Sequence, residues 1–116
     1  MKRGFMKYLI VKSHVPSFDY QVVMERDEVI RYKRKKTDSS GWIWCTNSRG
    51  ESCWIPENWV EFLGAQGVLK REYNSKELAV HAGDKVEVHL IESGWAWIST
   101  AADETGWIPQ ECLKRD

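Results

Sequence analysis

Short stretches of alternating apolar and polar residues recur along the chain and predict β-strands rather than helices. In the stretch at 85–90, for example, Val86, Val88 and Leu90 are expected to share one face. No stretch combines a helical period with capping residues at both ends. The pattern therefore predicts an all-β chain. Strands are expected at residues 8–12, 28–33, 42–46, 68–70, 85–90 and 95–99.

Two motifs that contain tryptophan recur at a single offset of 53 residues. Because tryptophan is rare, two such coincidences at one offset indicate an internal duplication. Upstream of the motifs, residues 26–29 match residues 83–86 at an offset of 57. The recurring motifs are GWIW at 41–44 with GWAW at 94–97, and WIP at 54–56 with WIP at 107–109.

The duplication predicts two small domains in tandem, residues 1–62 and 63–116. Each copy has a size close to the lower limit for one independently stable core. Only the short segment 61–67 connects the matching regions of the copies. Phe62 and Leu63 within it are expected either to pack between the two domains or to cap the first core.

Strand parity divides the tryptophan hairpin of the first copy into two faces. Side chains alternate along a strand, so Trp42 and Trp44 share one face and Ile43 and Cys45 share the other. We assign Ile43 and Cys45 to the core. The indoles are expected to stand partly in water, where each offers a flat apolar wall and one N–H donor.

The order and spacing of these motifs resemble the Src-homology-3 (SH3) family twice, over residues 7–62 and 67–114. In that family a loop ending in Gly-Asp precedes a tryptophan hairpin, a strand ending in Ile-Pro, and an Asn-Tyr-Val segment. Here Gly-Asp stands at 83–84, and Asn-Trp-Val stands at 58–60. The resemblance implies two five-stranded barrels, each with a shallow aromatic groove that binds extended, often proline-rich peptides.

Carried over position by position, the resemblance implies a peptide-binding site that is more complete in the first copy. The family's first-strand tyrosine positions hold Lys12 and His14 in that copy, and Lys70 and Glu72 in the second. The second copy also has Glu-Cys at 111–112 in place of Asn-Tyr. The implied peptide-binding residues are Trp42, Trp54, Pro56, Asn58 and Trp59 in the first copy, with Trp95, Trp107 and Pro109 in the second.

The overall charge is balanced, since Lys plus Arg and Asp plus Glu both total 17. Residues 1–62 carry 11 basic and 8 acidic side chains (net +3), and residues 63–116 carry 6 and 9 (net −3). This asymmetry indicates solubility or a mild attraction between the copies. The densest basic run, residues 31–36, precedes Trp42. It predicts a solvated loop or one that attracts acidic residues of a peptide.

Two alternative functions remain open at this point. The basic run 31–36 together with Trp42 could bind nucleic acid or another anionic ligand, with phosphates at the cations and bases on the indole. Alternatively, the chain is a structural assembly module or a cell-wall-peptide-binding module. In the assembly case the tryptophan faces would be buried against each other.

The chain shows no pattern typical of a catalytic or metal site. Cys45 and Cys53 are expected to face each other across a hairpin as reduced thiols. Cys112 has no histidine placed beside it by the sequence, and His14, His81 and His89 do not fall at zinc-ligand spacings with the cysteines. We therefore expect a non-enzymatic protein without metal or cofactor.

The three cysteines and the absence of a long apolar segment favour a cytoplasmic protein that does not enter a membrane. The expected partner is a protein or peptide, proline-rich sequences included, with nucleic acid the less favoured ligand. A monomer or weak homo-oligomer is expected. Met1 and Met6 are both candidate initiators.

Overall fold

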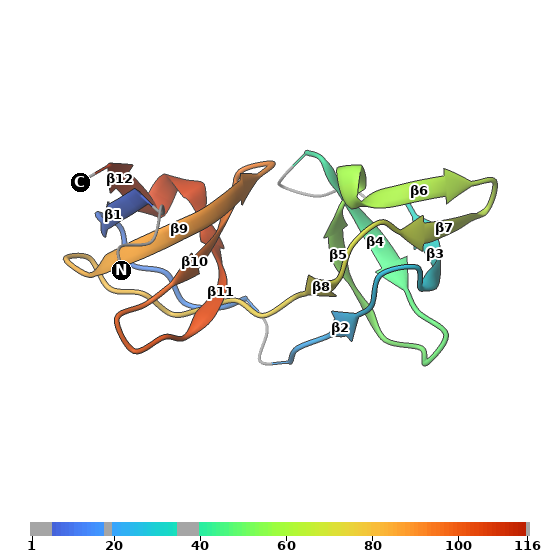
Figure 1. The fold of residues 1–116 in the computed structure, drawn as a ribbon, viewed down its shortest axis with the longest axis horizontal. Helices are drawn as coiled ribbons and strands as arrows, with labels where there is room; N and C mark the ends of the chain where they lie inside the picture. Colours follow the sequence, from blue (N-terminus) through green and yellow to red (C-terminus); the bar gives the residue numbers. More distant parts are fainter. Residues whose placement is uncertain (1–5, 18–19, 35–39, 116) are drawn as a thin grey trace. The chain divides into compact units, whose positions relative to one another are not determined.

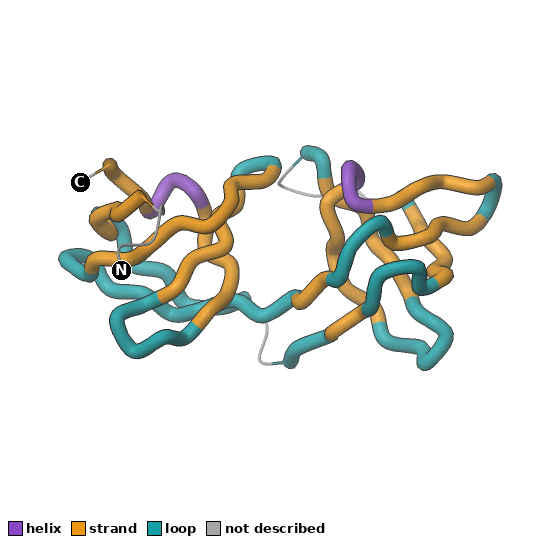
Figure 2. Tube along the Cα trace, in the orientation of Figure 1, coloured by secondary structure: helices purple, strands orange, loops and turns teal. Residues whose placement is uncertain are grey.

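A computed structural model describes residues 6–17, 20–34 and 40–115 of the chain (Figure 1). These residues are all-β, as the alternating pattern predicts, and two short 3-10 helices are the only helical turns among them (Figure 2). The helices are η1 (Glu57–Trp59) and η2 (Gln110–Cys112). The strands are β1 (Met6–Ile10), β2 (Val23–Met24), β3 (Val29–Lys33), β4 (Trp42–Thr46), β5 (Ser52–Pro56), β6 (Val60–Leu63), β7 (Gln66–Leu69), β8 (Tyr73–Asn74), β9 (Lys85–Glu92), β10 (Trp95–Ser99), β11 (Thr105–Pro109) and β12 (Leu113–Arg115).

The described strands form two five-stranded sheets and one two-stranded sheet. The strand order is β11-β10-β9-β1-β12 in one large sheet and β5-β4-β3-β7-β6 in the other, and β2 pairs with β8. Every neighbouring pair is antiparallel. The two large sheets therefore repeat the same order, with β1 in one occupying the place of β7 in the other.

The chain divides into two compact units that are nested rather than consecutive. One unit, here called the split unit, consists of Met1–Asp19 and Lys76–Asp116, and the inserted unit is Tyr20–Ser75. The predicted boundaries, 1–62 and 63–116, are therefore wrong. The physical reason is strand pairing: β1 pairs with β9 and β12, whereas β7 pairs with β3 and β6.

The segment predicted to connect two domains is instead a tight hairpin inside the inserted unit. Strands β6 and β7 are joined by only Gly64 and Ala65, and Gly64 has a φ of 66°. A positive φ at the first residue of a two-residue turn is typical of β-hairpins and favours glycine. Phe62 packs edge-on against Tyr32 of the same unit, with ring centroids 4.8 Å apart, whereas Leu63 is 58% exposed.

The nested division also changes the distribution of charge. The inserted unit carries nine basic and eight acidic side chains (net +1), and the split unit carries eight and nine (net −1). The net charges of +3 and −3 were obtained only because the chain was divided at residues 62 and 63. Charge therefore provides no basis for an attraction between the two units.

The core follows the parity predicted for the tryptophan hairpin. Ile43 and Cys45 of β4 are buried, as are their β5 partners Ile55 and Cys53. In the split unit, Ala96, Ile98 and Ile108 take the corresponding places in a core that also contains Ile10, Val80 and Val86.

One predicted face is interrupted by a bulge in β9. Val88 pairs with Ile98 and packs on the core, but the register shifts so that Leu90 pairs with Trp97. Because cross-strand partners point to the same face, Leu90 lies on the tryptophan side. The prediction that Leu90 shares a face with Val86 and Val88 is wrong.

The backbone corrects the upstream alignment by one residue. Asp27 N donates to Leu69 O at 2.8 Å, and Gly83 N donates to Ile10 O at the same distance. Asp27 and Gly83 both have positive φ, 72° and 102°. These two positions are therefore equivalent, which gives an offset of 56 in place of the 57 expected from the sequence. The residues that share this turn geometry differ in identity, which is why the letters alone misaligned them.

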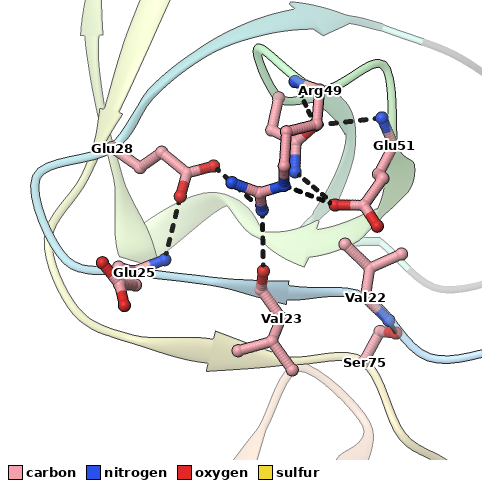
Figure 3. A network of polar contacts seen from close by, with 8 residues as sticks. Val22, Val23, Glu25, Glu28, Arg49, Glu51 and Ser75 are labelled. Carbon is pink, nitrogen blue, oxygen red and sulfur yellow. Dashed lines mark hydrogen bonds and ion pairs between the residues drawn. The ribbon is translucent and has the colours of Figure 1, made fainter.

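A polar network ties the β4–β5 turn to Glu28 and to the backbone of β2 (Figure 3). Arg49 donates to the Val23 carbonyl at 3.1 Å, pairs with Glu51 at 2.9 Å, and lies 3.8 Å from the Glu28 carboxylate. Hydrogen bonding to Asn47 and Arg49 lowers the pKa of Glu51. The network holds the turn against β2, the strand that pairs with β8 and so positions Tyr73.

Candidate functional site

The β4–β5 hairpin places four of the aromatic and proline side chains on one face of the inserted unit. Trp42 lies opposite Pro56, and Trp44 lies opposite Trp54. The Trp44 and Trp54 rings meet edge-on, with centroids 5.2 Å apart and an interplanar angle of 68°. The opposite face of the same hairpin packs on the core, and on this face Trp44 and Trp54 are half-buried while Trp42 and Pro56 are buried.

Helix η1 and strand β8 add two further rings. Pro56 leads directly into η1, which ends at Trp59. Trp59 packs edge-on against Tyr73, with centroids 5.6 Å apart and an interplanar angle of 76°. Tyr73 is positioned by pairing with Met24 and is 3% exposed. The two pairs, Trp42 with Pro56 and Trp59 with Tyr73, come from three separate segments, and we refer to the four residues together as the aromatic cluster.

Backbone hydrogen bonds show which residues of the two units are equivalent in the segments where first-strand tyrosines were expected. Val11 N donates to Cys112 O, and Lys70 N donates to Trp59 O, both at 2.8 Å. Val11 and Lys70 are therefore equivalent. It follows that Lys12 matches Arg71 and His14 matches Tyr73.

The positions predicted as Lys70 and Glu72 are accordingly Arg71 and Tyr73. The prediction was one residue out of register, and it assigned this segment to the wrong copy. Tyr73 is the counterpart of His14, and it supplies an aromatic ring at a position where the sequence prediction had none.

Arg71 lies against the aromatic cluster. Its guanidinium carbon is 4.1 Å from the centroid of the Trp59 ring, a close cation–π contact, and the residue is exposed. Asn58, next to Trp59, is also exposed. The site therefore combines mostly covered rings with two polar side chains that reach solvent.

The rings themselves are more deeply buried than predicted. Trp42 is 8% exposed, Trp59 7% and Trp107 3%, and Pro56 is fully buried. Each indole is a large ring that packs against its neighbours, so little of its surface remains in contact with water. The residues with part-exposed side chains are Trp44, Trp54, Trp95, Trp97 and Pro109.

The split unit repeats the hairpin pairs of the inserted unit but differs at the positions of Trp59 and Tyr73. Trp95 lies opposite Pro109, and His14 meets Trp95 edge-on with centroids 5.9 Å apart. Trp107 packs edge-on against Trp97, with ring centroids 5.3 Å apart, as Trp54 does against Trp44. Cys112 stands where the inserted unit has Trp59 and is 1% exposed. The split unit, with the predicted residues Trp95, Trp107 and Pro109, therefore has no counterpart, among its described residues, of the contact between Trp59 and Tyr73.

Two groups of polar side chains in the split unit contact each other. His14 Nε2 lies 3.0 Å from Glu77 Oε1, and the same carboxylate oxygen accepts a hydrogen bond from Ser17 N at 3.1 Å. Lys12 pairs with Glu111 at 3.2 Å. Lys12 and Glu111 are the counterparts of Arg71 and Asn58, so the two units differ in charge at equivalent places.

The basic run is only partly described, since Lys35 and Lys36 lie outside the described residues. Arg34 pairs with Glu57 at 3.3 Å and stacks over Phe62 and Tyr32 at 5.4 and 5.7 Å. An arginine with an internal carboxylate partner is less available to a phosphate.

All three cysteines are buried. Cys45 and Cys53 are cross-strand partners, and all three cysteines are free thiols. Burial raises the pKa of Cys45 to about 12, and burial likewise raises the pKa of Cys53 and of Cys112. Within the described part of the chain no group of three or more potential metal ligands occurs.

No family model, curated protein or solved structure matches this chain. Among the described residues there is also no helix with the length and apolar character needed to cross a bilayer.

Proposed function

We propose that the inserted unit is an SH3-like barrel that binds extended peptides, including proline-rich ones, and catalyses no reaction. The observation that carries this proposal is the packing of Tyr73 against Trp59. Together with Trp42 and Pro56, these side chains occupy positions at which the SH3 pattern has ligand contacts. We further propose the same barrel fold for the split unit, which shares the strand order.

The chemistry of the site suits an extended peptide. A polyproline II segment is stiff before binding, so docking it costs little conformational entropy. Indole and phenol edges offer apolar contact with N–H and O–H groups, and Asn58 adds an amide. Because Trp42 and Trp59 are mostly covered, a ligand would contact ring edges, and the small buried area favours affinities of about micromolar.

Selection from a random peptide library against the immobilised full chain tests the proposal. We expect selected peptides to lose about three- to tenfold in affinity for Asn58→Ala, because one hydrogen bond is removed. Glu111→Ala is the matched control, since it is the equivalent exposed residue of the split unit. Peptides that bind both variants as well as the wild-type protein would contradict the proposed site.

A further inference from the structure

The two units differ in charge at one pair of equivalent positions, Lys12 with Glu111 and Arg71 with Asn58. In the split unit, the cation Lys12 is paired with the carboxylate of Glu111 at 3.2 Å. In the inserted unit, the equivalent cation is Arg71 and the equivalent of Glu111 is Asn58, which carries no charge. The same place in the fold is therefore neutralised in one unit and left with a positive charge in the other.

Arg71 has no carboxylate partner within the described part of the chain. The ion pairs there involve Lys12, His14, Arg34 and Arg49. Arg34 also stacks on aromatic rings, but Glu57 neutralises it. Arg71 thus differs from Arg34 in being a guanidinium that stacks on an indole without an internal counter-charge.

Stacking on Trp59 prepares Arg71 for a carboxylate. The planar guanidinium presents a fork of N–H donors that matches a carboxylate in a bidentate geometry. Its contact with the indole restricts the side chain before a ligand arrives, so less conformational freedom is lost on binding.

We propose that the peptide bound by the inserted unit carries an aspartate or glutamate side chain that pairs with Arg71 beside Trp59. This inference rests on the proposed function and specifies its ligand. At this position the site selects a carboxylate where the SH3 pattern, with tyrosine in place of Arg71, has a proline slot. Apolar residues of the peptide, proline among them, then lie toward Trp42.

The test is a random peptide library fused at its C-terminus to the display protein, so that every available carboxylate belongs to a side chain. The wild-type chain, Arg71→Glu and Lys12→Glu are used as baits. We expect Asp and Glu to be enriched at one position by wild type and by Lys12→Glu. Arg71→Glu should lose this enrichment and select Lys or Arg at the same position.

A second variant tests the inference without removing the arginine. Asn58→Glu reproduces in the inserted unit the internal pair formed by Lys12 and Glu111. It should weaken an acidic peptide selected by wild type about tenfold or more, whereas Asn58→Gln should change its affinity far less. Circular dichroism checks that each bait is folded.

The outcomes separate the two proposals. If wild type and Arg71→Glu select the same acidic content, but their peptides still lose affinity with Asn58→Ala, the carboxylate inference is overturned and peptide binding stands. If no selected peptide responds to Asn58→Ala or Asn58→Glu, the proposed site fails and the inference fails with it.

Discussion

Val22 and Ser75 close the inserted unit with two hydrogen bonds. Val22 N donates to Ser75 Oγ at 2.8 Å, and Ser75 N donates to Val22 O at 2.9 Å. Residues near the two ends of the unit are thereby held together (Figure 3). A segment whose ends meet can be excised without separating strands that pair with each other.

We therefore predict that residues 20–75 fold on their own, whereas residues 1–62 do not. The fragment 1–62 lacks β7, so β3 and β6 would lose the strand that lies between them. Urea titration followed by circular dichroism should show a cooperative transition for 20–75 only. Cooperative unfolding of 1–62 together with a disordered 20–75 would contradict the nested division.

Gly67 tests the packing of the β6–β7 hairpin. A Cβ at this position would lie 2.6 Å from Val60 Cγ1, closer than van der Waals contact permits. Gly67→Ala should lower the free energy of unfolding by about 1–3 kcal/mol, because the core must shift to accommodate the methyl group. In a double-mutant cycle, Val60→Ala should remove part of this cost. Strictly additive effects would show that the two residues do not pack together.

Trp42 has a structural role as well as its proposed role in binding. Its 8% exposure means that Trp42→Ala removes a large buried ring, with an expected loss of about 3–5 kcal/mol of stability. Thermal or urea unfolding of the variant measures this directly. A Trp42→Ala protein as stable as wild type would show that the ring is not packed as described. For this reason Asn58 and Arg71 are better sites than Trp42 for testing ligand binding.

Cys45 should make stability depend on pH in alkaline solution. Burial raises the pKa of its thiol from 9.0 to about 12, so the folded state keeps the proton after the unfolded state has lost it. This contribution is fully present below about pH 9 and is lost as the pH rises toward 12. Cys45→Ala should flatten the decrease in unfolding free energy over that window. An unchanged slope would contradict the burial of this thiol.

The hairpins illustrate what the sequence does predict. Strands at 42–46 and 95–99 were expected from alternation alone, and the structure has β4 and β10 at these bounds. The assignment of Ile43 and Cys45 to the core is also confirmed. These features depend on neighbouring residues within a few positions, and a period of two specifies them.

Strand partners could not be predicted in the same way. The segments Ile-Val-Lys at 10–12 and Val-Leu-Lys at 68–70 are too similar for their patterns to state which sheet each one joins. The choice follows from Gly64, which lets β7 turn back onto β6 with only two residues and little loop-closure entropy.

The residues missed at the site were lost through the same ambiguity. A slip of one residue in register moves a side chain to the other face of a strand. The slip placed Lys70 and Glu72, rather than Arg71 and Tyr73, at the expected first-strand tyrosine positions, so neither Arg71 nor Tyr73 entered the predicted site. The sequence Leu-Gly-Ala-Gln at 63–66 could have indicated a two-residue hairpin turn at Gly64 and Ala65. Such a turn would have placed residues 66–69 beside 60–63 in the same unit.

The most direct measurement of the central claim is an amide and indole chemical-shift map of the ¹⁵N-labelled full chain, titrated with a library-selected peptide. We predict that the largest shifts fall on the indole N–H groups of Trp42 and Trp59 and on the amides of Asn58 and Arg71. Trp95 and Trp107 should remain nearly unchanged. Shifts confined to the split unit, or an absence of saturable shifts in residues 20–75, would contradict peptide binding by the inserted unit.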